Sequence, residues 1–217
     1  IAVITNASLL DDPGVREDLE QADWVSLKID SVDQKTWKKI DRPHGNIKFD
    51  NLLGGVRDFG AEYQGQLVSE TMLVKDLTDD PINLQAVSRY LAEIRPSLSY
   101  LSVPTRPPAE DWVLPPVEAA VTAAYQIFKK VDLQTECLIG YEGVNFTRTG
   151  RISDDLLSIT SVHPMREDAV QSFLKKSGED FKIVQDLIEE GLLVVSEHQG
   201  HRFYLRKLSR QKDQSRD

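Results

Sequence analysis

The sequence predicts a parallel α/β sheet or partial barrel followed by a small winged helix-turn-helix domain. Strand patterns alternate with helical patterns up to about residue 140, which is typical of parallel βαβ units. The last third of the chain has the pattern of three short helices followed by a hairpin. With 217 residues, of which 40% are hydrophobic and 28% charged, the composition is that of a soluble globular protein with room for one domain and a smaller second one.

Apolar runs and helix start signals define the elements of the first part. The expected strands are residues 1–5, 24–29, 67–74, 98–103 and 136–140. Two helices are expected to begin at Pro13 and after Asp33, and three more are expected over residues 49–63, 81–94 and 117–131. Asp12 before Pro13 is a capping residue followed by proline at the first helical position. Right-handed crossovers between such strands give either a barrel or an open sheet, with the site at the carboxyl ends of the strands.

The last third predicts a winged helix, with helices over 152–160, 165–175 and 179–190 and two strands flanking the turn Gln199-Gly200. The helix over 179–190 carries five acidic residues against Lys182 alone, which is the wrong sign for a phosphate-lined groove. We therefore expect a module that binds protein or presents substrate rather than nucleic acid. The expected domains are a partial barrel over 1–140, a linker over 141–151, the winged helix over 152–206 and a polar tail over 207–217.

Composition excludes several classes of protein. The net charge of −9 disfavours general nucleic-acid binding, because phosphate contacts need lysine and arginine. No apolar run approaches the roughly 18 residues of a membrane span, and no signal peptide is visible. The single cysteine, Cys137, excludes a disulfide framework and points to a cytoplasmic setting, where we expect it to be a buried structural thiol. Because the chain opens at Ile1 inside a strand pattern, we expect that residues precede it in the natural protein.

Polar residues at the strand ends are the candidate site. They are Asn6, Ser26, Lys28, Asp30, Glu70 and Arg106. Ser26, Lys28 and Asp30 share one side of their strand by period-two alternation. We expect the group to converge at the carboxyl ends of the strands, where Lys28 or Arg106 contacts a carboxylate. Two structural roles stay open, an ion pair of Lys28 with Glu70 or Asp30 and a loop-bracing pair of Arg106 with Glu110.

Four segments together resemble the radical S-adenosylmethionine (radical SAM) superfamily, in its iron-sulfur oxidoreductase branch. They are Val3–Leu10, Val25–Asp30, Arg42-Pro43-His44 and Pro104–Glu110. The resemblance covers about residues 1–140 and implies strands three to six of a six-stranded barrel. It also implies a [4Fe-4S] cluster held by a CxxxCxxC triplet, which this sequence lacks. The cluster ligands are thus expected outside this chain, in a missing N-terminal segment of the same protein.

The resemblance implies reductive cleavage of S-adenosylmethionine and hydrogen abstraction from a substrate that the sequence does not name. In that reaction class the cluster delivers one electron to the sulfonium, so an electron donor such as ferredoxin or flavodoxin is implied. Asn6 and Ser26 would hold the nucleoside, and Glu70 or Asp30 would accept from ribose hydroxyls. Lys28 and Arg106 would bind a carboxylate. No catalytic residue and no metal ligand is assigned within this chain, and neither nucleic acid nor membrane is an expected partner.

Two other readings of the sequence stay open. The first is a winged-helix regulator or interaction protein whose α/β domain binds a small ligand, against which the acidic helix over 179–190 argues. The second is a barrel lyase or aldolase that forms a Schiff base on Lys28. Borohydride trapping on Lys28 is the observation that the second reading requires.

Overall fold

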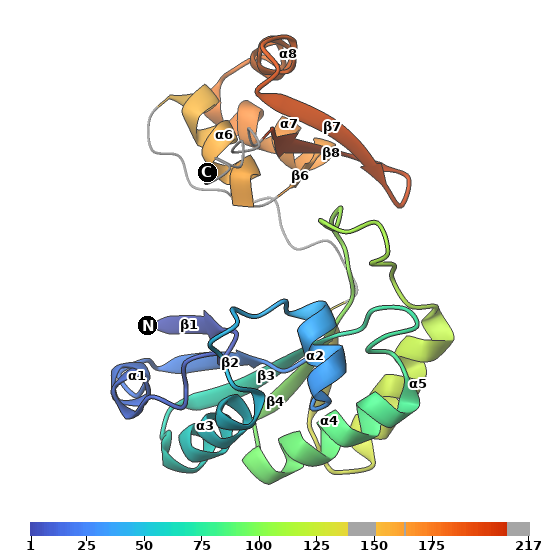
Figure 1. Ribbon diagram of the computed structural model, residues 1–217. Coiled ribbons are helices and arrows are strands. Elements are labelled where there is room, and N and C mark those ends of the chain that lie inside the picture. Colours follow the sequence, from blue (N-terminus) through green and yellow to red (C-terminus); the bar gives the residue numbers. More distant parts are fainter. Residues whose placement is uncertain (139–150, 163, 208–217) are drawn as a thin grey trace, which may run out of the picture. The chain divides into compact units, whose positions relative to one another are not determined.

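The computed structural model describes residues 1–138, 151–162 and 164–207 (Figure 1). They form two compact units. The first comprises Ile1–Pro104 together with the segment that starts at Glu110, and the second comprises Thr105–Ala109 together with the residues from 151 onward. The expected linker and tail fall, except for their end residues Arg151 and Lys207, outside the described residues.

The first unit is a five-stranded parallel sheet with order β1-β2-β3-β4-β5. Its elements in chain order are β1 Ala2–Thr5, α1 Pro13–Leu19, β2 Trp24–Lys28, α2 Gln34–Ile40, α3 Phe49–Glu62, β3 Gln66–Met72, α4 Pro81–Ile94, β4 Leu98–Ser102, α5 Glu118–Lys129 and β5 Thr135–Leu138. The expected parallel α/β fold, open at the edge formed by residues 1–5, is therefore confirmed. The sheet has one strand more than the four that the resemblance implied.

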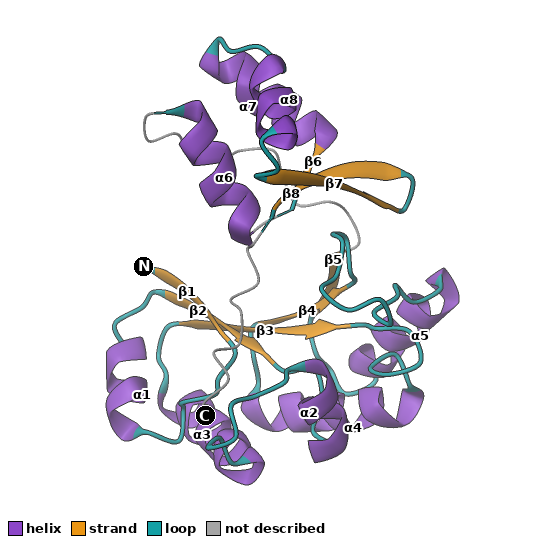
Figure 2. Cartoon of the chain, turned by 45° about the horizontal axis from the view of Figure 1, so that its top comes forward, coloured by secondary structure: helices purple, strands orange, loops and turns teal. Residues whose placement is uncertain are grey.

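All five helices cover the same face of this sheet, as both views show (Figures 1 and 2). One core lies between them and includes Val56 and Phe59 of α3, Leu91 of α4 and Phe128 of α5, each fully buried. The helices start where the sequence indicates, because Asp12, Asp33 and Asp80 accept hydrogen bonds from the first-turn amides of α1, α2 and α4. The other face of the sheet carries no helix of the first unit.

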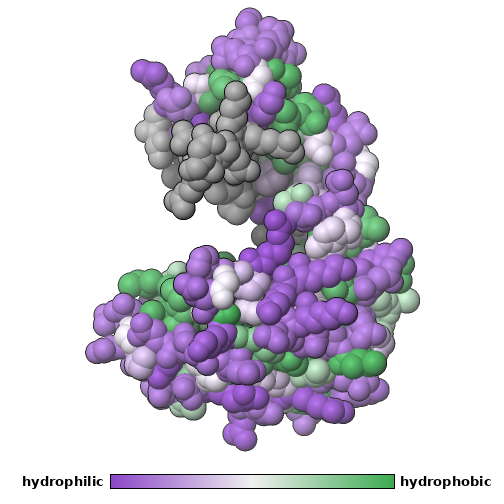
Figure 3. Space-filling model, in the orientation of Figure 1, coloured by the Kyte–Doolittle hydropathy of each residue, from purple (hydrophilic) through white to green (hydrophobic). Residues whose placement is uncertain are grey.

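The edge strand β1 leaves apolar side chains in solvent. Ile4 is 73% exposed, and Ile1 and Leu9 on either side of the strand are also exposed. Figure 3 shows hydrophobic surface on the side of the first unit where β1 lies. An unpaired parallel edge with such side chains can template further pairing.

The second unit packs three helices against a three-stranded antiparallel sheet of order β6-β8-β7. Its elements are α6 Ile152–Val162, β6 Met165–Arg166, α7 Glu167–Ser177, α8 Lys182–Glu189, β7 Leu193–His198 and β8 His201–Arg206. Gln199 and Gly200 have positive φ and form the expected two-residue turn. Residues 165 and 166 were expected to be helical, which is wrong: they are extended and pair with Tyr204 and Phe203.

No helix in the described part of the chain has the length and hydrophobicity that crossing a bilayer requires.

Candidate functional site

Polar residues of β2 lie on the helix-free face of the parallel sheet. Val25 and Leu27 are buried in the core beneath the helices. Because successive side chains of a strand point to opposite faces, Ser26, Lys28 and Asp30 belong to the other face. The period-two expectation for these three residues thus agrees with the packing of their neighbours.

The register of the sheet places further polar residues beside Lys28. Lys28 is the partner of Glu70, Glu70 of Tyr100, and Tyr100 of Glu136. Residues in register on neighbouring strands share a face, so these four form one row across the sheet. Lys28 is the last residue of β2 and Glu70 lies two residues before the end of β3, so this part of the row is near the carboxyl ends of the strands, where α/β folds place their ligands. Tyr100 lies in the middle of β4, and Glu136 is the second residue of β5.

A buried ion pair anchors this row. Lys28 Nζ lies 2.5 Å from Asp30 Oδ2, with the Asp30 side chain fully buried and the Lys28 side chain 29% exposed. The other carboxylate oxygen of Asp30 accepts a hydrogen bond of 2.8 Å from the backbone N–H of Met72. Asp30 thus ties the end of β2 to the end of β3. Of the two carboxylates that the sequence offered to Lys28, Asp30 makes the ion pair.

Glu70 has a different partner. The hydroxyl of Ser102, the last residue of β4, donates to Glu70 Oε1 over 2.8 Å. Sequence reasoning did not select Ser102. Two properties could have identified Ser102: it lies at the end of a strand, and it is two residues after Tyr100, so both side chains point to the same face of the sheet.

Asp41 is a second residue that sequence reasoning missed. It follows the last residue of α2, after two lysines, and its sequence context is that of an ordinary helix end. Asp41 as a whole residue is exposed. Desolvation of its carboxyl group and the neighbouring Asp30 carboxylate raise its pKa to about 7, although the Lys28 ammonium acts in the opposite direction. A protonated Asp41 carboxyl can donate a hydrogen bond to the Asp30 carboxylate, which also raises the pKa of Asp41.

Lys28 is held as an ammonium ion. Burial acts to lower its pKa, but the carboxylates of Asp30, Glu70 and Asp41 outweigh burial and raise it above the ordinary value. An amine that forms a Schiff base needs the opposite shift, so that the neutral form is populated. The geometry therefore argues against the lyase or aldolase reading.

The other expected site residues are placed as follows. Asn6 follows β1, and its side-chain oxygen accepts from the N–H of Ser8 over 3.1 Å, which leaves the amide nitrogen for other partners. Ser26 is buried, in register between Ile4 and Val68. Arg106 belongs to Thr105–Ala109, which groups with the second unit, and its convergence with the other residues stays a prediction. The carboxylate of Glu110 accepts a hydrogen bond from Arg42.

Within the described ranges, no three or more His, Cys, Asp and Glu side chains are arranged to hold a metal ion. Cys137 packs against the core from β5, and burial raises the pKa of its thiol, which favours the neutral form. Its surroundings fit a structural thiol.

Comparison with known proteins gives the chain a family and its first unit a fold. No family model matches the chain. A solved domain of pyruvate-formate lyase-activating enzyme from Bacteroides vulgatus is similar over 64% of this chain and 80% of its own length, with a TM-score of 0.51 and 17% identity. A radical SAM methyltransferase from Sphaerobacter thermophilus is similar over 66% of this chain and 41% of its own, with a TM-score of 0.50 and 15% identity. At this identity the likeness shows the fold, which is of the radical SAM type.

The sequence comparison is more specific. A UPF0026 protein of Methanocaldococcus jannaschii is 37% identical over 218 aligned residues, which cover 99% of this chain and 68% of that protein. An alignment of this identity along the full chain shows common descent, and the chain belongs to the UPF0026 family.

Proposed function

We propose that this chain is the portion of a radical SAM enzyme, an oxidoreductase, that binds the nucleoside and amino-acid parts of S-adenosylmethionine. The observation that carries the proposal is a group of polar side chains near the carboxyl ends of β2, β3 and β4, on the face that the helices leave uncovered. It combines one fixed cation, Lys28, with the acceptor Glu70 and the hydroxyl of Ser102. The fold of the first unit and the resemblance of four sequence segments support the same assignment.

The residues present suit this ligand chemically. The Lys28 ammonium can bind a carboxylate, and the Glu70 carboxylate can accept from ribose hydroxyls. Ser26 and the amide nitrogen of Asn6 are short polar groups at or near the ends of the neighbouring strands. Bound S-adenosylmethionine would supply the organic radical chemistry, whereas these side chains bind and orient it and exclude water.

The residues present do not suit a [4Fe-4S] cluster. Such a cluster needs cysteine thiolates, and the sequence contains Cys137 alone. We infer that the cluster ligands come from outside these 217 residues, in an N-terminal segment of the same protein that would also cover the β1 edge. An electron donor such as ferredoxin or flavodoxin would then be a partner of the whole protein.

Binding of S-adenosylmethionine to the chain tests the proposal. We expect calorimetry to detect binding, with the affinity lowered about tenfold in Glu70→Gln and in Ser102→Ala, since each removes a hydrogen bond of a charged group. Glu93→Gln is the matched control, because Glu93 is exposed on α4 and pairs only with Arg57 among the described residues. Equal affinity in all variants would leave Glu70 and Ser102 as structural residues.

Activity is tested on the protein expressed from its whole reading frame. After anaerobic reconstitution with iron and sulfide and reduction with dithionite, we expect release of 5′-deoxyadenosine from S-adenosylmethionine. Absence of an iron-sulfur chromophore after reconstitution would contradict the proposed reaction.

We further infer that the second unit is a winged helix that binds protein or presents substrate. The order helix, strand, helix, helix, strand, strand supports the first part. The charge of α8 supports a role in binding protein or presenting substrate. The helix and the residue after it carry three acidic side chains, Asp186, Glu189 and Glu190, and one basic side chain, Lys182, which already pairs with Asp186. We expect no salt-dependent binding to duplex DNA in a gel-shift assay. A tight, salt-dependent shift would favour the regulator reading instead.

A further inference from the structure

A groove of about 630 Å³ in the first unit is lined by all three residues of the Arg42-Pro43-His44 motif and by none of the polar row. It is enclosed by α2, the loop after α2 and the first turn of α3. We call it the Arg42 groove. Its lining includes Lys38, Arg42, His44, Lys48, Phe49 and Asp50. The proposed function uses none of these residues.

The Arg42 groove is positively charged in a chain of net charge −9. Three permanently cationic side chains line it, Lys38, Arg42 and Lys48, against the single carboxylate of Asp50. Within the part of the chain that the structure describes, Lys38 and Lys48 make no ion pair. Arg42 has a partner, Glu110, which fixes one arm of its guanidinium and leaves other N–H donors of the fork. Like charges gathered this way repel one another unless an anion lies between them.

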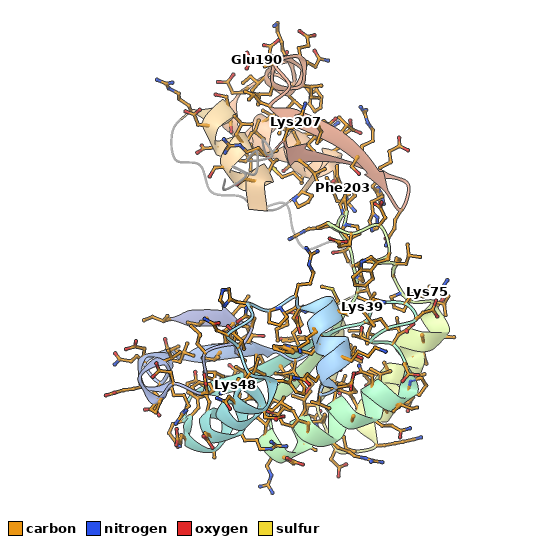
Figure 4. All side chains as sticks on the ribbon, in the orientation of Figure 1. Lys39, Lys48, Lys75, Glu190, Phe203 and Lys207 are labelled. Carbon is orange, nitrogen blue, oxygen red and sulfur yellow. The ribbon has the colours of Figure 1, made fainter. Side chains whose placement is uncertain are left out.

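The start of α3 adds to this positive field. Lys48 is the N-cap residue of α3, and no side chain accepts from its first amides, whereas Asp caps α1, α2 and α4. A cation at the N-terminus of a helix opposes the helix dipole, so this position is unfavourable for stability on its own. Figure 4 shows Lys48 at the beginning of α3.

The rest of the lining fits an organic group. Pro43 and Ile47, both partly exposed, give the groove an apolar portion beside the cations, whereas Phe49 is buried in the core beneath it. Its volume is in the range of sites for small organic ligands. Two lysines, an arginine fork and amide donors match a doubly charged oxyanion better than a carboxylate, which carries one charge and two oxygens.

We propose that the Arg42 groove binds the phosphate group of a small organic phosphate ester. Lys38, Arg42 and Lys48 supply the charge, the amides at the start of α3 supply hydrogen bonds, and Pro43 and Ile47 contact the organic portion. This site is separate from the S-adenosylmethionine site and needs neither that ligand nor a cluster.

Phenyl phosphate and inorganic phosphate, with phenol as the uncharged comparison, are suitable probes for titration of the whole chain by calorimetry at low salt. We expect phenyl phosphate to bind more tightly than inorganic phosphate, and phenol to show no binding. Lys38→Gln combined with Lys48→Gln should weaken phenyl phosphate binding at least tenfold. The control is Lys35→Gln combined with Lys75→Gln, which changes net charge equally, and neither of these residues lines this groove; its affinity should stay within about twofold.

A stability measurement separates a folding defect from a binding defect. Lys48→Asp should raise the melting temperature of the ligand-free chain, because it introduces a capping acceptor, and should abolish phenyl phosphate binding. Equal weakening in the control pair, or phenol binding as tightly as phenyl phosphate, would overturn the proposal. So would displacement of phenyl phosphate by a short single-stranded oligonucleotide at a hundredfold lower concentration, which would assign the groove to nucleic acid.

Discussion

Asp30 is the residue on which the geometry of the candidate site depends. Its side chain is fully buried, and it binds both the Lys28 ammonium and the Met72 amide across two strands. A buried carboxylate is tolerated only when it is paired and hydrogen-bonded. The site is therefore part of the stability of the sheet as well as a place for a ligand.

Removing Lys28 should destabilise the chain. Lys28→Met leaves the Asp30 carboxylate buried without its counter-ion, and the free energy of unfolding should fall by about 3 kcal/mol in urea denaturation at pH 7. The double variant with Asp30→Asn, which removes the uncompensated charge, should recover more than half of that loss. A double variant as unstable as Lys28→Met would show that the ion pair is not the source of the effect.

Asp41 should make stability depend on pH. A carboxyl group whose pKa is raised on folding contributes stability that is present at acidic pH and is lost as the pH rises from the unfolded value of about 4 through the folded value of about 7. Asp41→Asn keeps a donor for Asp30 without the charge. The variant should have a higher free energy of unfolding than the parent at both pH values, and the difference should be larger at pH 8 than at pH 5.

The control for this prediction is Asp58→Asn, which changes the same net charge at an exposed position of α3. It should leave the difference between pH 5 and pH 8 as in the parent. If Asp41→Asn gave no stabilisation at pH 8, the pKa of Asp41 would not be raised in the folded chain.

At the residue scale the sequence predicted the positions of Lys28 and Asp30 and offered Asp30 as one of two ion-pair partners of Lys28. Lys28 and Asp30 were identified from alternation along one strand, because period two is a local property. Asp41 was not identified, because it comes close to Asp30 only through the packing of α2 and the residues after it in the folded chain. Local spacing in the sequence does not predict such a tertiary contact. Ser102 was within reach, since the same alternation and strand-end argument that chose Glu70 applies to it.

At the scale of elements, α3 packs closely against the loop that follows β1. A Cβ built on Gly55 would lie 2.2 Å from the backbone carbonyl carbon of Leu10, whereas one built on the adjacent Gly54 meets nothing within 4 Å. Backbone atoms cannot move aside as a flexible side chain can. Close packing of α3 on Leu10 therefore requires glycine at position 55 but not at position 54.

The two glycines make a matched pair for experiment. Gly55→Ala should lower the free energy of unfolding by about 2 kcal/mol, because overpacking outweighs the gain in helix propensity. Gly54→Ala should raise it by up to about 1 kcal/mol through propensity alone. Thermal and urea denaturation of both variants measure this, and equal effects of the two substitutions would contradict the close packing of α3 on Leu10.

Element types were predicted better than element ends. The sequence located α4 at its exact bounds because Asp80, Pro81 and the spacing of Leu84, Val87 and Leu91 all agree. It missed β6 because two residues are too few for any period, and only the pairing of Met165 with Tyr204 defines that strand. Strands that exist through distant partners are the ones that local patterns do not predict.

At the scale of the whole molecule, residues 1–138, 151–162 and 164–207 form two separate hydrophobic cores. The core of the second unit includes Leu156, Phe173, Val184 and Tyr204, each at least 99% buried, and it is distinct from the core under the parallel sheet. A unit with its own core can fold as a unit, although one of this size has a small margin of stability.

The two cores should therefore unfold as separate transitions. Phe173→Ala removes a buried ring from the second core and should cost about 3–5 kcal/mol there, enough to unfold a small module. Circular dichroism and backbone NMR of the whole chain should then show loss of dispersed signals from residues 151–207, with the signals of the first unit retained. Phe128→Ala makes the reciprocal change in the first core. Loss of all dispersed signals in the Phe173→Ala variant would mean that the two units fold as one cooperative body.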